Sequence, residues 1–236
     1  AGLPRADGSG YDITPQLFAL QMKPYRELHL FAAGGCCGTT PEFIRLLKQS
    51  FGGEEPAVRS ATPRSWLCTP VKPVEVNDVT VVGERINPTG KKRFQQALRD
   101  GDMDYILTQA VEQMNAGAKV LDVNVGLPGV DEPAMMEMAV KAIQSVVDLP
   151  LQLDSTKPEV LERGLRVYNG KPIVNSVNGE QKVLDAILPL CKKYGAAVIG
   201  LTLDENGIPK KAEQRVEVAR RIQQAALAAG IPNEDI

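Results

Sequence analysis

The fold is indicated most clearly by residues 149–180, LPLQLDSTKPEVLERGLRVYNGKPIVNSVNGE. It contains an apolar run that ends in Asp154, a helical stretch, and a second apolar run that ends in Asn175. Short apolar runs with polar tips, separated by a helix, are typical of successive βα units. In a parallel sheet or barrel the carboxyl ends of the strands open on one face, where ligands bind. The stretch therefore predicts a carboxylate and an amide, on neighbouring strands, that look into one site.

The same alternation continues on both sides of this stretch. Between residues 78 and 236, apolar strands alternate with helical stretches in five βα units. The strands are nearly continuous apolar runs, as expected of parallel strands covered on both faces, so the fold class is α/β. Polar residues end every strand: Glu84, Asn87, Asp122, Asn124, Asp154, Asn175, Asn178 and Asp204. A doubly wound sheet concentrates its ligand at one switch point, so these tips favour a (β/α)8 TIM-type barrel, truncated after about five units.

Residues 1–50 predict the end of a second domain. Thr14-Pro15 caps a helical stretch, HLFAAGG at residues 29–35 predicts a short buried strand, and another helix begins near Pro41. These few elements cannot enclose a core by themselves. We therefore expect the end of a second domain whose beginning is absent, in a chain that is truncated at both ends.

The segment between these two parts has the composition of a connection. Residues 51–77 contain Gly-Gly and repeated prolines without sustained periodicity, which indicates a linker or an extended segment wrapped over a domain. We expect Trp66 to anchor this segment by packing. The predicted organisation is thus 1–50, a linker at 51–77, and a domain at 78–236.

Composition limits the classes of partner. The 236 residues are 43% hydrophobic and carry a formal net charge of −2, which gives no basic face for nucleic acid. No apolar run reaches the roughly 18 residues that cross a bilayer, so no membrane partner is indicated. The first residues lack the pattern of a signal peptide, and four cysteines are too few for a disulfide scaffold. We expect a cytoplasmic protein with reduced thiols.

Two polar motifs leave alternatives open. In GERINPTGKKRF, residues 83–94, Glu84 and Arg85 either form a buried ion pair that stabilises the barrel mouth or serve a ligand. The motif lacks the spacing of a phosphate loop. In LDVNVG, period-two alternation sends Asp122 and Asn124 to one face, where they either form an internal network or meet a polar ligand.

Asp154 and Asn175 are the better candidates for direct ligand contact, because each ends an apolar run at the open end of its strand. A carboxylate can accept two N–H bonds, and an asparagine amide donates and accepts at once. This pair suits a flat nitrogen heterocycle with adjacent donors and acceptors.

Several motifs also carry a family resemblance. From residue 83 onward, GERINPTG, LDVNVG, LDST, NSVNGE and GLTLDENGIPK resemble the pterin-binding barrel of methyltetrahydrofolate methyltransferases. This family includes cobalamin-dependent methionine synthases and methyltetrahydrofolate:corrinoid methyltransferases. In residues 1–50, AGLP, YDITP and GGCCGTTPE resemble the C-terminal end of the homocysteine-binding zinc domain that precedes this barrel in methionine synthases. The resemblance thus implies that residues 1–50 are the C-terminal remnant of a second barrel. The order of the two parts is the most specific signal.

The resemblance implies roles for individual residues. Asp154 and Asn175 match the pterin-binding pair of the family, and Asp122 and Asn124 match its inward polar strand end. The loop that lies against the folate is matched by Gly90, Lys91 and Lys92. No catalytic acid or base is implied within this chain.

The resemblance also implies a part of a zinc site. Cys36 and Cys37 match two of the three zinc-binding cysteines of the homocysteine domain. The remaining candidate donors are Cys68, Cys191 and His29. They do not predict a closed tetrahedral site in this chain.

The implied activity is methyl transfer from 5-methyltetrahydrofolate to cobalamin, carried on another module, and then to homocysteine at zinc, as part of a methionine synthase. This chain would supply the folate-binding barrel. Its partners would be the folate, a corrinoid-carrying domain or protein, and the rest of each barrel, from this or another chain. Three alternatives remain: a methyltetrahydrofolate:corrinoid methyltransferase with another final acceptor, a dihydropteroate-synthase-like enzyme, or an inactive folate-binding fragment. The GGCCGTTPE segment has no place in a dihydropteroate synthase.

Overall fold

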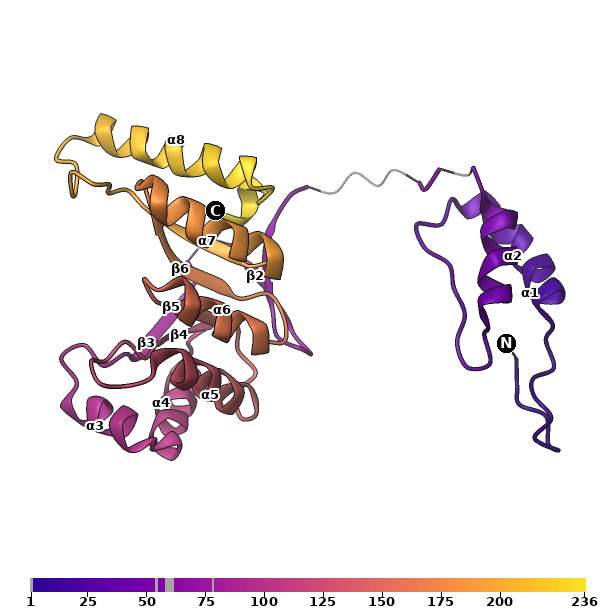
Figure 1. The fold of residues 1–236 in the computed structure, drawn as a ribbon, viewed down its shortest axis with the longest axis horizontal. Helices are drawn as coiled ribbons and strands as arrows, with labels where there is room; N and C mark the ends of the chain where they lie inside the picture. The colour runs from indigo at the N-terminus through magenta and orange to yellow at the C-terminus, as the bar shows by residue number, and fades with distance from the viewer. Residues whose placement is uncertain (1, 54, 58–61, 78) are drawn as a thin grey trace. The chain divides into compact units, whose positions relative to one another are not determined.

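A computed structural model of the chain describes residues 2–53, 55–57, 62–77 and 79–236 (Figure 1). The chain divides into two compact units, Ala1–Thr62 and Pro63–Ile236. Residues 54 and 58–61 of the predicted linker lie outside the described residues, as does Asp78 at the start of the predicted second domain.

The first unit contains short helices that pack on one another. α1 (Pro15–Met22) continues into η1 (Lys23–Leu28), and α2 (Pro41–Phe51) packs against α1. The side chain of Thr14 accepts a hydrogen bond from the backbone N–H of Leu17 at 3.2 Å, so the predicted helix cap is confirmed. Phe18 of α1 and Phe43 of α2 meet edge to face, with ring centroids 5.6 Å apart.

The prediction of a strand at residues 29–35 is wrong. These residues form no strand, and the side chain of Phe31 is 92% exposed. A strand needs a neighbour to satisfy its backbone N–H and C=O groups, and the described residues of the first unit contain no other strand. A short apolar run alone is therefore not enough to form one.

The second unit is built on a parallel sheet (Figure 1). Its five strands are β3 (Val82–Ile86), β4 (Val120–Asn124), β5 (Leu151–Asp154), β6 (Ile173–Asn178) and β7 (Ala197–Leu201). The helices are α3 (Lys92–Asp100), α4 (Met103–Asn115), α5 (Glu132–Gln144), α6 (Pro158–Val167), α7 (Gln181–Tyr194) and α8 (Ala212–Ala228). The strands lie side by side in their order along the chain, so the sheet has no switch point. This confirms the predicted α/β fold of the barrel type.

The core of the second unit lies between the sheet and its helices. Leu121, Val123 and Leu153 are fully buried and belong to one cluster with side chains of α5 and α6. Side chains alternate along a strand, so the polar residues between these apolar ones face the other side of the sheet. The inner side of the sheet therefore collects the polar side chains.

Part of the predicted linker belongs to the second unit as a hairpin of β1 (Ser65–Cys68) and β2 (Pro73–Val76). Cys68 and Lys171 exchange two backbone hydrogen bonds, at 3.2 and 3.0 Å. Gly170 permits this approach, because a Cβ at its φ of +142° would collide with the carbonyl oxygen of Cys68. At the end of the chain, η2 (Asn233–Asp235) contributes Asp235, whose two carboxylate oxygens each lie 2.6 Å from the Lys171 ammonium.

Leu67 anchors the hairpin, and Trp66 does not. The Trp66 side chain is 42% exposed, whereas Leu67 is fully buried against the first residues of three strands, Val120, Ile173 and Ala197. Alternation along β1 turns neighbouring side chains to opposite faces, so only one of the two can be buried. The hairpin thus covers the amino ends of the strands and leaves their carboxyl ends to other residues.

Leu67→Ala should lower the free energy of unfolding of the second unit by about 2–5 kcal/mol, because it removes a fully buried side chain from a small cluster. Urea unfolding followed by circular dichroism measures this loss. Trp66→Ala is the matched control on the same strand and should cost much less. Equal losses for the two variants would show that the hairpin is not held through Leu67.

Candidate functional site

Polar side chains from three neighbouring strands meet at the carboxyl end of the sheet. Asn124 lies opposite Asp154 in the register of β4 and β5, and Asp154 lies opposite Asn175 in the register of β5 and β6. Side chains of register partners in a parallel sheet project to the same side, so these three form a row at one level. The amide of Asn124 donates a hydrogen bond to Asp154, with Nδ2 2.9 Å from Oδ2. The structure thus brings together the acid and the amide that the sequence singled out.

A second pair lies deeper on the same face. Asp122 and Gln152 are register partners on β4 and β5, and the Gln152 Nε2 donates to Asp122 Oδ1 at 2.5 Å. Only 2% of Asp122 and 8% of Gln152 are exposed. The side chain of Asn175 also acts on Asp122, because it stabilises the ionised carboxylate and so opposes the rise in its pKa. The buried pair is therefore coupled electrostatically to the row at the mouth.

Burial dominates the electrostatics of this site. Burial raises the pKa of Asp122 from 3.8 to about 6, and the charges of Asp154 and Glu84 add to the rise, while the hydrogen bond from Gln152 and the side chain of Asn175 oppose it. Burial also raises the pKa of Asp154, which the hydrogen bond from Asn124 opposes. Three carboxyl groups converge here, so the mouth suits a ligand that presents N–H donors better than it suits an anion.

Both ends of the Asn124 amide make a hydrogen bond within the protein. Its Oδ1 accepts from the backbone N–H of Gly126 at 2.8 Å, and its Nδ2 donates to Asp154. No described residue donates to the other carboxylate oxygen of Asp154. Asn124 therefore orients Asp154, and Asp154 keeps an acceptor for a ligand.

The loop after β3 differs from the sequence prediction. The prediction of a buried Glu84–Arg85 ion pair is wrong, because neighbouring residues of a strand point to opposite faces and both side chains are exposed. Glu84 instead pairs with Lys91, whose Nζ lies 3.4 Å from the carboxylate and 3.0 Å from the Glu84 carbonyl oxygen. In the turn before Lys91, Gly90 takes a φ of +70°. Lys92 is the first residue of α3, and its side chain is exposed.

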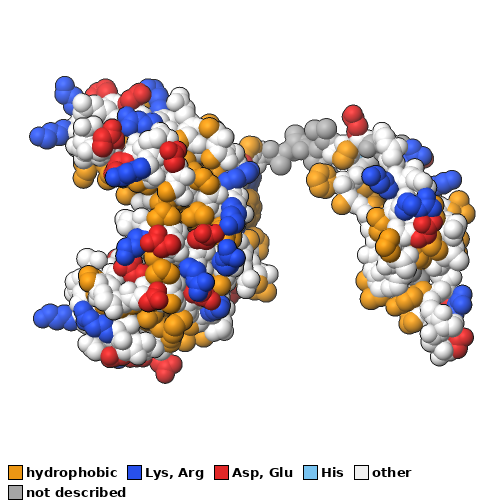
Figure 2. Space-filling model, in the orientation of Figure 1, with side chains coloured by type: hydrophobic (Ala, Val, Ile, Leu, Met, Phe, Trp, Pro, Cys, Tyr) orange, Lys and Arg blue, Asp and Glu red, His pale blue; other side chains and the backbone are white. Residues whose placement is uncertain are grey.

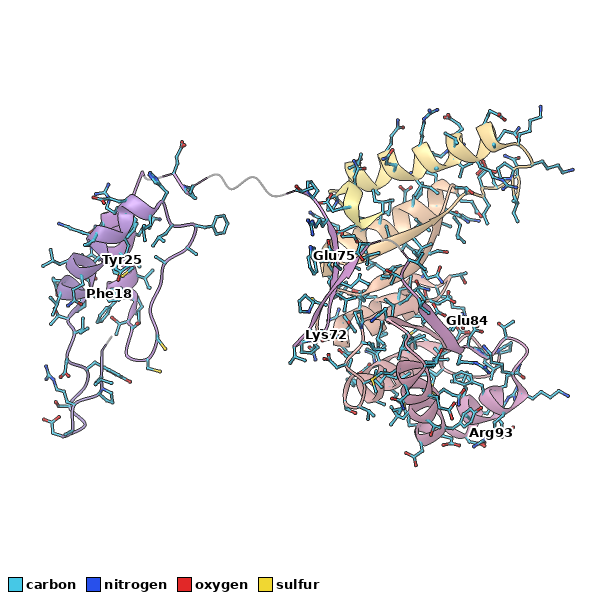
Figure 3. All side chains as sticks on the ribbon, turned by 180° about the vertical axis from the view of Figure 1, so that it is seen from behind. Phe18, Tyr25, Lys72, Glu75, Glu84 and Arg93 are labelled. Atoms are coloured by element: carbon cyan, nitrogen blue, oxygen red, sulfur yellow. The ribbon has the colours of Figure 1, made fainter. Side chains whose placement is uncertain are left out.

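The second unit is hollowed between the end that carries α3 and the end that carries α8 (Figure 2). Glu84 lies at the edge of this hollow on β3 (Figure 3). Positive and negative side chains are interspersed on the face shown in Figure 2, in agreement with the small net charge. In the described part of the chain, no helix has both the length and the apolar content needed to cross a bilayer.

The remaining strand ends form local contacts. Asn178 accepts from the backbone N–H of Glu180 at 2.9 Å and donates to its carboxylate at 3.1 Å. Asp204 lies 3.6 Å from the guanidinium of Arg221, which also donates to the carbonyl oxygen of Gly179 at 3.0 Å. Asn87 accepts from the backbone N–H of Thr89 at 2.9 Å. These side chains shape the loops around the mouth.

Gln152 is a residue of the site that the apolar pattern of its strand conceals. Its position two residues before Asp154 places both side chains on one face. In a strand, a polar residue two positions before a polar strand end lies on the same face, and this spacing is the signal that could have revealed Gln152. Arg221 gave no such signal, because an arginine on a helix is ordinarily solvated.

The cysteines of the first unit do not complete a zinc site. Cys36 and Cys37 are both exposed, and their sulfur atoms are 3.8 Å apart. Nδ1 of His29 lies 3.2 Å from the carbonyl oxygen of Glu55. Among the described residues, no three histidine, cysteine or acidic side chains are grouped so that they could hold a metal. Structural and catalytic zinc takes at least three protein ligands, so the donors among the described residues do not fit zinc.

The comparisons with known proteins define the class. Residues 83–236 match the family described as pterin binding enzyme, and residues 1–51 match homocysteine S-methyltransferases. The first match covers more than half of the chain, so the chain belongs to the family of pterin-binding enzymes.

A particular relative narrows this assignment. Methionine synthase from Mycobacterium tuberculosis (strain ATCC 25618 / H37Rv) is 34% identical over 233 residues, which are 94% of this chain and 20% of that protein. With the matches of both segments, this confirms the resemblance to the methionine synthase family. The chain spans only a fifth of this relative's length.

Solved structures of dihydropteroate synthases share the fold. The enzyme from Thermus thermophilus gives a TM-score of 0.52 at 21% identity, over 71% of this chain and 62% of that one. The enzyme from Stenotrophomonas maltophilia with active site-bound imidazole gives 0.54 at 15% identity, over 72% and 63%. At such identities the likeness shows the fold alone.

Proposed function

We propose that the second unit is the folate-binding barrel of a methionine synthase and binds 5-methyltetrahydrofolate where β4, β5 and β6 end. The observation that carries the proposal is the row formed by Asn124, Asp154 and Asn175, with the Asp122–Gln152 pair beneath it. The match to pterin-binding enzymes and the similarity to a methionine synthase support the choice of ligand.

The chemistry of the pterin fits this row. The amino-pyrimidinone edge of a pterin presents adjacent N–H donors, which the Asp154 carboxylate accepts, and the Asn175 amide meets a neighbouring donor or acceptor. Because Asn124 holds one oxygen of Asp154, the carboxylate is oriented before the ligand arrives. On this proposal Gly90, Lys91 and Lys92 lie against the remainder of the folate.

Within the reaction, this chain orients the methyl donor. A corrinoid on another module would supply the nucleophile that takes the methyl group. The tertiary amine N5 is a poor leaving group, so it must gain a proton during transfer. A buried polar shell that holds the pterin ring would organise that step without a strong local acid. Homocysteine would then receive the methyl group in the part of the protein to which residues 1–50 belong, and a cytoplasmic location suits these reduced thiols.

The domain organisation follows as part of the proposal. Residues 1–50 would be the end of the homocysteine-binding domain, and the pterin-binding domain would extend through residue 236. The hairpin at residues 65–76 packs on the sheet, so we propose that it belongs to the pterin-binding domain and that the connection is confined to the residues before it.

Isothermal titration calorimetry of the full chain with 5-methyltetrahydrofolate tests the function. We expect one bound ligand per chain, and no heat with p-aminobenzoate alone, because that molecule lacks the pterin edge. A folded chain that binds no tetrahydrofolate would refute the proposal. Formation of dihydropteroate from a pterin pyrophosphate and p-aminobenzoate would favour a dihydropteroate-synthase-like enzyme, although residues 1–51 match homocysteine S-methyltransferases.

A further inference from the structure

Gln152 is a buried polar residue inside an apolar strand. It lies between Leu151 and Leu153, both fully buried on the helix side, and its own side chain faces the polar interior. Burying an amide is unfavourable unless it is hydrogen-bonded, and Gln152 meets this requirement by donating to Asp122 at 2.5 Å. An aliphatic side chain would fill the same space without that requirement. The glutamine therefore needs a reason beyond packing.

Asp122 transmits the effect of Gln152 to the mouth. Its carboxylate accepts from Gln152, and the side chain of Asn175 stabilises its ionised form. An ionised carboxylate only accepts hydrogen bonds, so Asn175 must turn its NH2 group toward Asp122. The carbonyl oxygen of the Asn175 amide is then left to face away from Asp122, and the register partner of Asn175 on β5 is Asp154. The hydrogen-bonding pattern offered to a ligand thus depends on the ionised state of Asp122.

Two other carboxylates act against that state. Asp154 on β5 and Glu84 on β3 both repel a charge on Asp122, and burial disfavours the charge further. If Asp122 were protonated it would become a donor, and the Asn175 amide could reverse to present its carbonyl oxygen to Asp122. The ligand would then meet an NH2 group in place of an acceptor. The hydrogen bond from Gln152 opposes this outcome.

We propose that Gln152 is a positioning residue that holds Asp122 as an acceptor and thereby fixes which end of the Asn175 amide faces the pterin. The inference rests on the proposed function for the identity of the ligand. Its internal part, the chain from Gln152 through Asp122 to Asn175, concerns the protein alone. The two parts can therefore be tested separately.

The ligand-free test uses nuclear magnetic resonance of the full chain. Gln152→Leu should shift the side-chain NH2 signals of Asn175, because Asp122 loses its fixed orientation. Gln144→Leu is the matched control: Gln144 bonds the backbone of Val140, Val167 and Asn169 on the helix side, away from the mouth. Unchanged Asn175 signals in a folded Gln152→Leu variant would overturn the inference, whatever the protein binds.

The binding test uses tetrahydrofolate. It adds the pH dependence of the affinity, which would not change if Gln152 had only a structural role. Gln152→Leu should weaken binding by about tenfold at neutral pH, and Gln144→Leu should leave it unchanged. Gln152→Glu should also weaken binding at neutral pH and recover as the pH falls, because one proton shared with Asp122 restores the hydrogen bond. Asp154 and Glu84 titrate in every variant, so each profile is compared with that of the native chain. Wild-type affinity and an unaltered pH profile in both Gln152 variants would overturn the inference, whereas failure of the native chain to bind would refute the proposed function only.

Discussion

Replacing Asp154 by alanine should weaken the binding of tetrahydrofolate by roughly 100- to 1000-fold. Asp154 lies at the centre of the row, between its register partners Asn124 and Asn175, and it provides the carboxylate for the N–H donors of the pterin. Hydrogen bonds to a charged group contribute about 1.5–3 kcal/mol each, and two of them would be lost. Calorimetric titration of the variant against the native chain measures the effect.

Two further variants make this result specific. Asp148→Ala removes a carboxylate from the other end of β5, where it accepts a hydrogen bond from Thr69 of the hairpin, and it should leave the affinity intact. Asp154→Asn keeps the shape but replaces one acceptor by a donor, so it should bind almost as weakly as Asp154→Ala. If the affinity of Asp154→Ala matched that of the native chain, the site would have to lie elsewhere.

The sequence predicted the features that depend on local pattern. The five parallel strands and their helices follow from alternating apolar runs, and the positions of Asp154 and Asn175 follow from the rule that parallel strands end on one face. A single chain of βα units also keeps neighbours in sequence as neighbours in space. The barrel type could therefore be predicted without any knowledge of distant contacts.

The features that the sequence did not predict depend on contacts between residues that are far apart in the sequence. β1 pairs with β2 and reaches the sheet through a bridge to Lys171, a residue about a hundred positions later, and its proline-rich surroundings give no strand signal. Residues 29–35 have the composition of a strand but no neighbouring strand among the described residues. The partner of Gln152 could not be predicted for a related reason, because only the register with β4 shows that Gln152 faces Asp122. Local periodicity cannot supply such pairings.

Asp122→Asn should change how stability depends on pH. The folded-state pKa of Asp122 is raised from 3.8 to about 6, so its contribution to stability is full below the unfolded value and is lost as the pH rises to about 6. At 1.36 kcal/mol per pKa unit this loss is on the order of 3 kcal/mol. Asparagine does not titrate, so the free energy of unfolding of the variant relative to the native chain should rise by that amount between pH 4 and about 6 and stay constant above.

Urea unfolding at successive pH values measures this difference, and Asp102→Asn provides a control of opposite sign. The hydrogen bond from the backbone N–H of Tyr105 lowers the pKa of Asp102, as does Arg93, so Asp102 stabilises the fold above its unfolded pKa and loses this effect as the pH falls. Relative to the native chain, Asp102→Asn should therefore become less stable as the pH rises, while Asp122→Asn becomes more stable. Parallel pH curves for Asp122→Asn and the native chain would mean that burial does not raise the pKa of Asp122. The role of Gln152 in keeping it ionised would then have no basis.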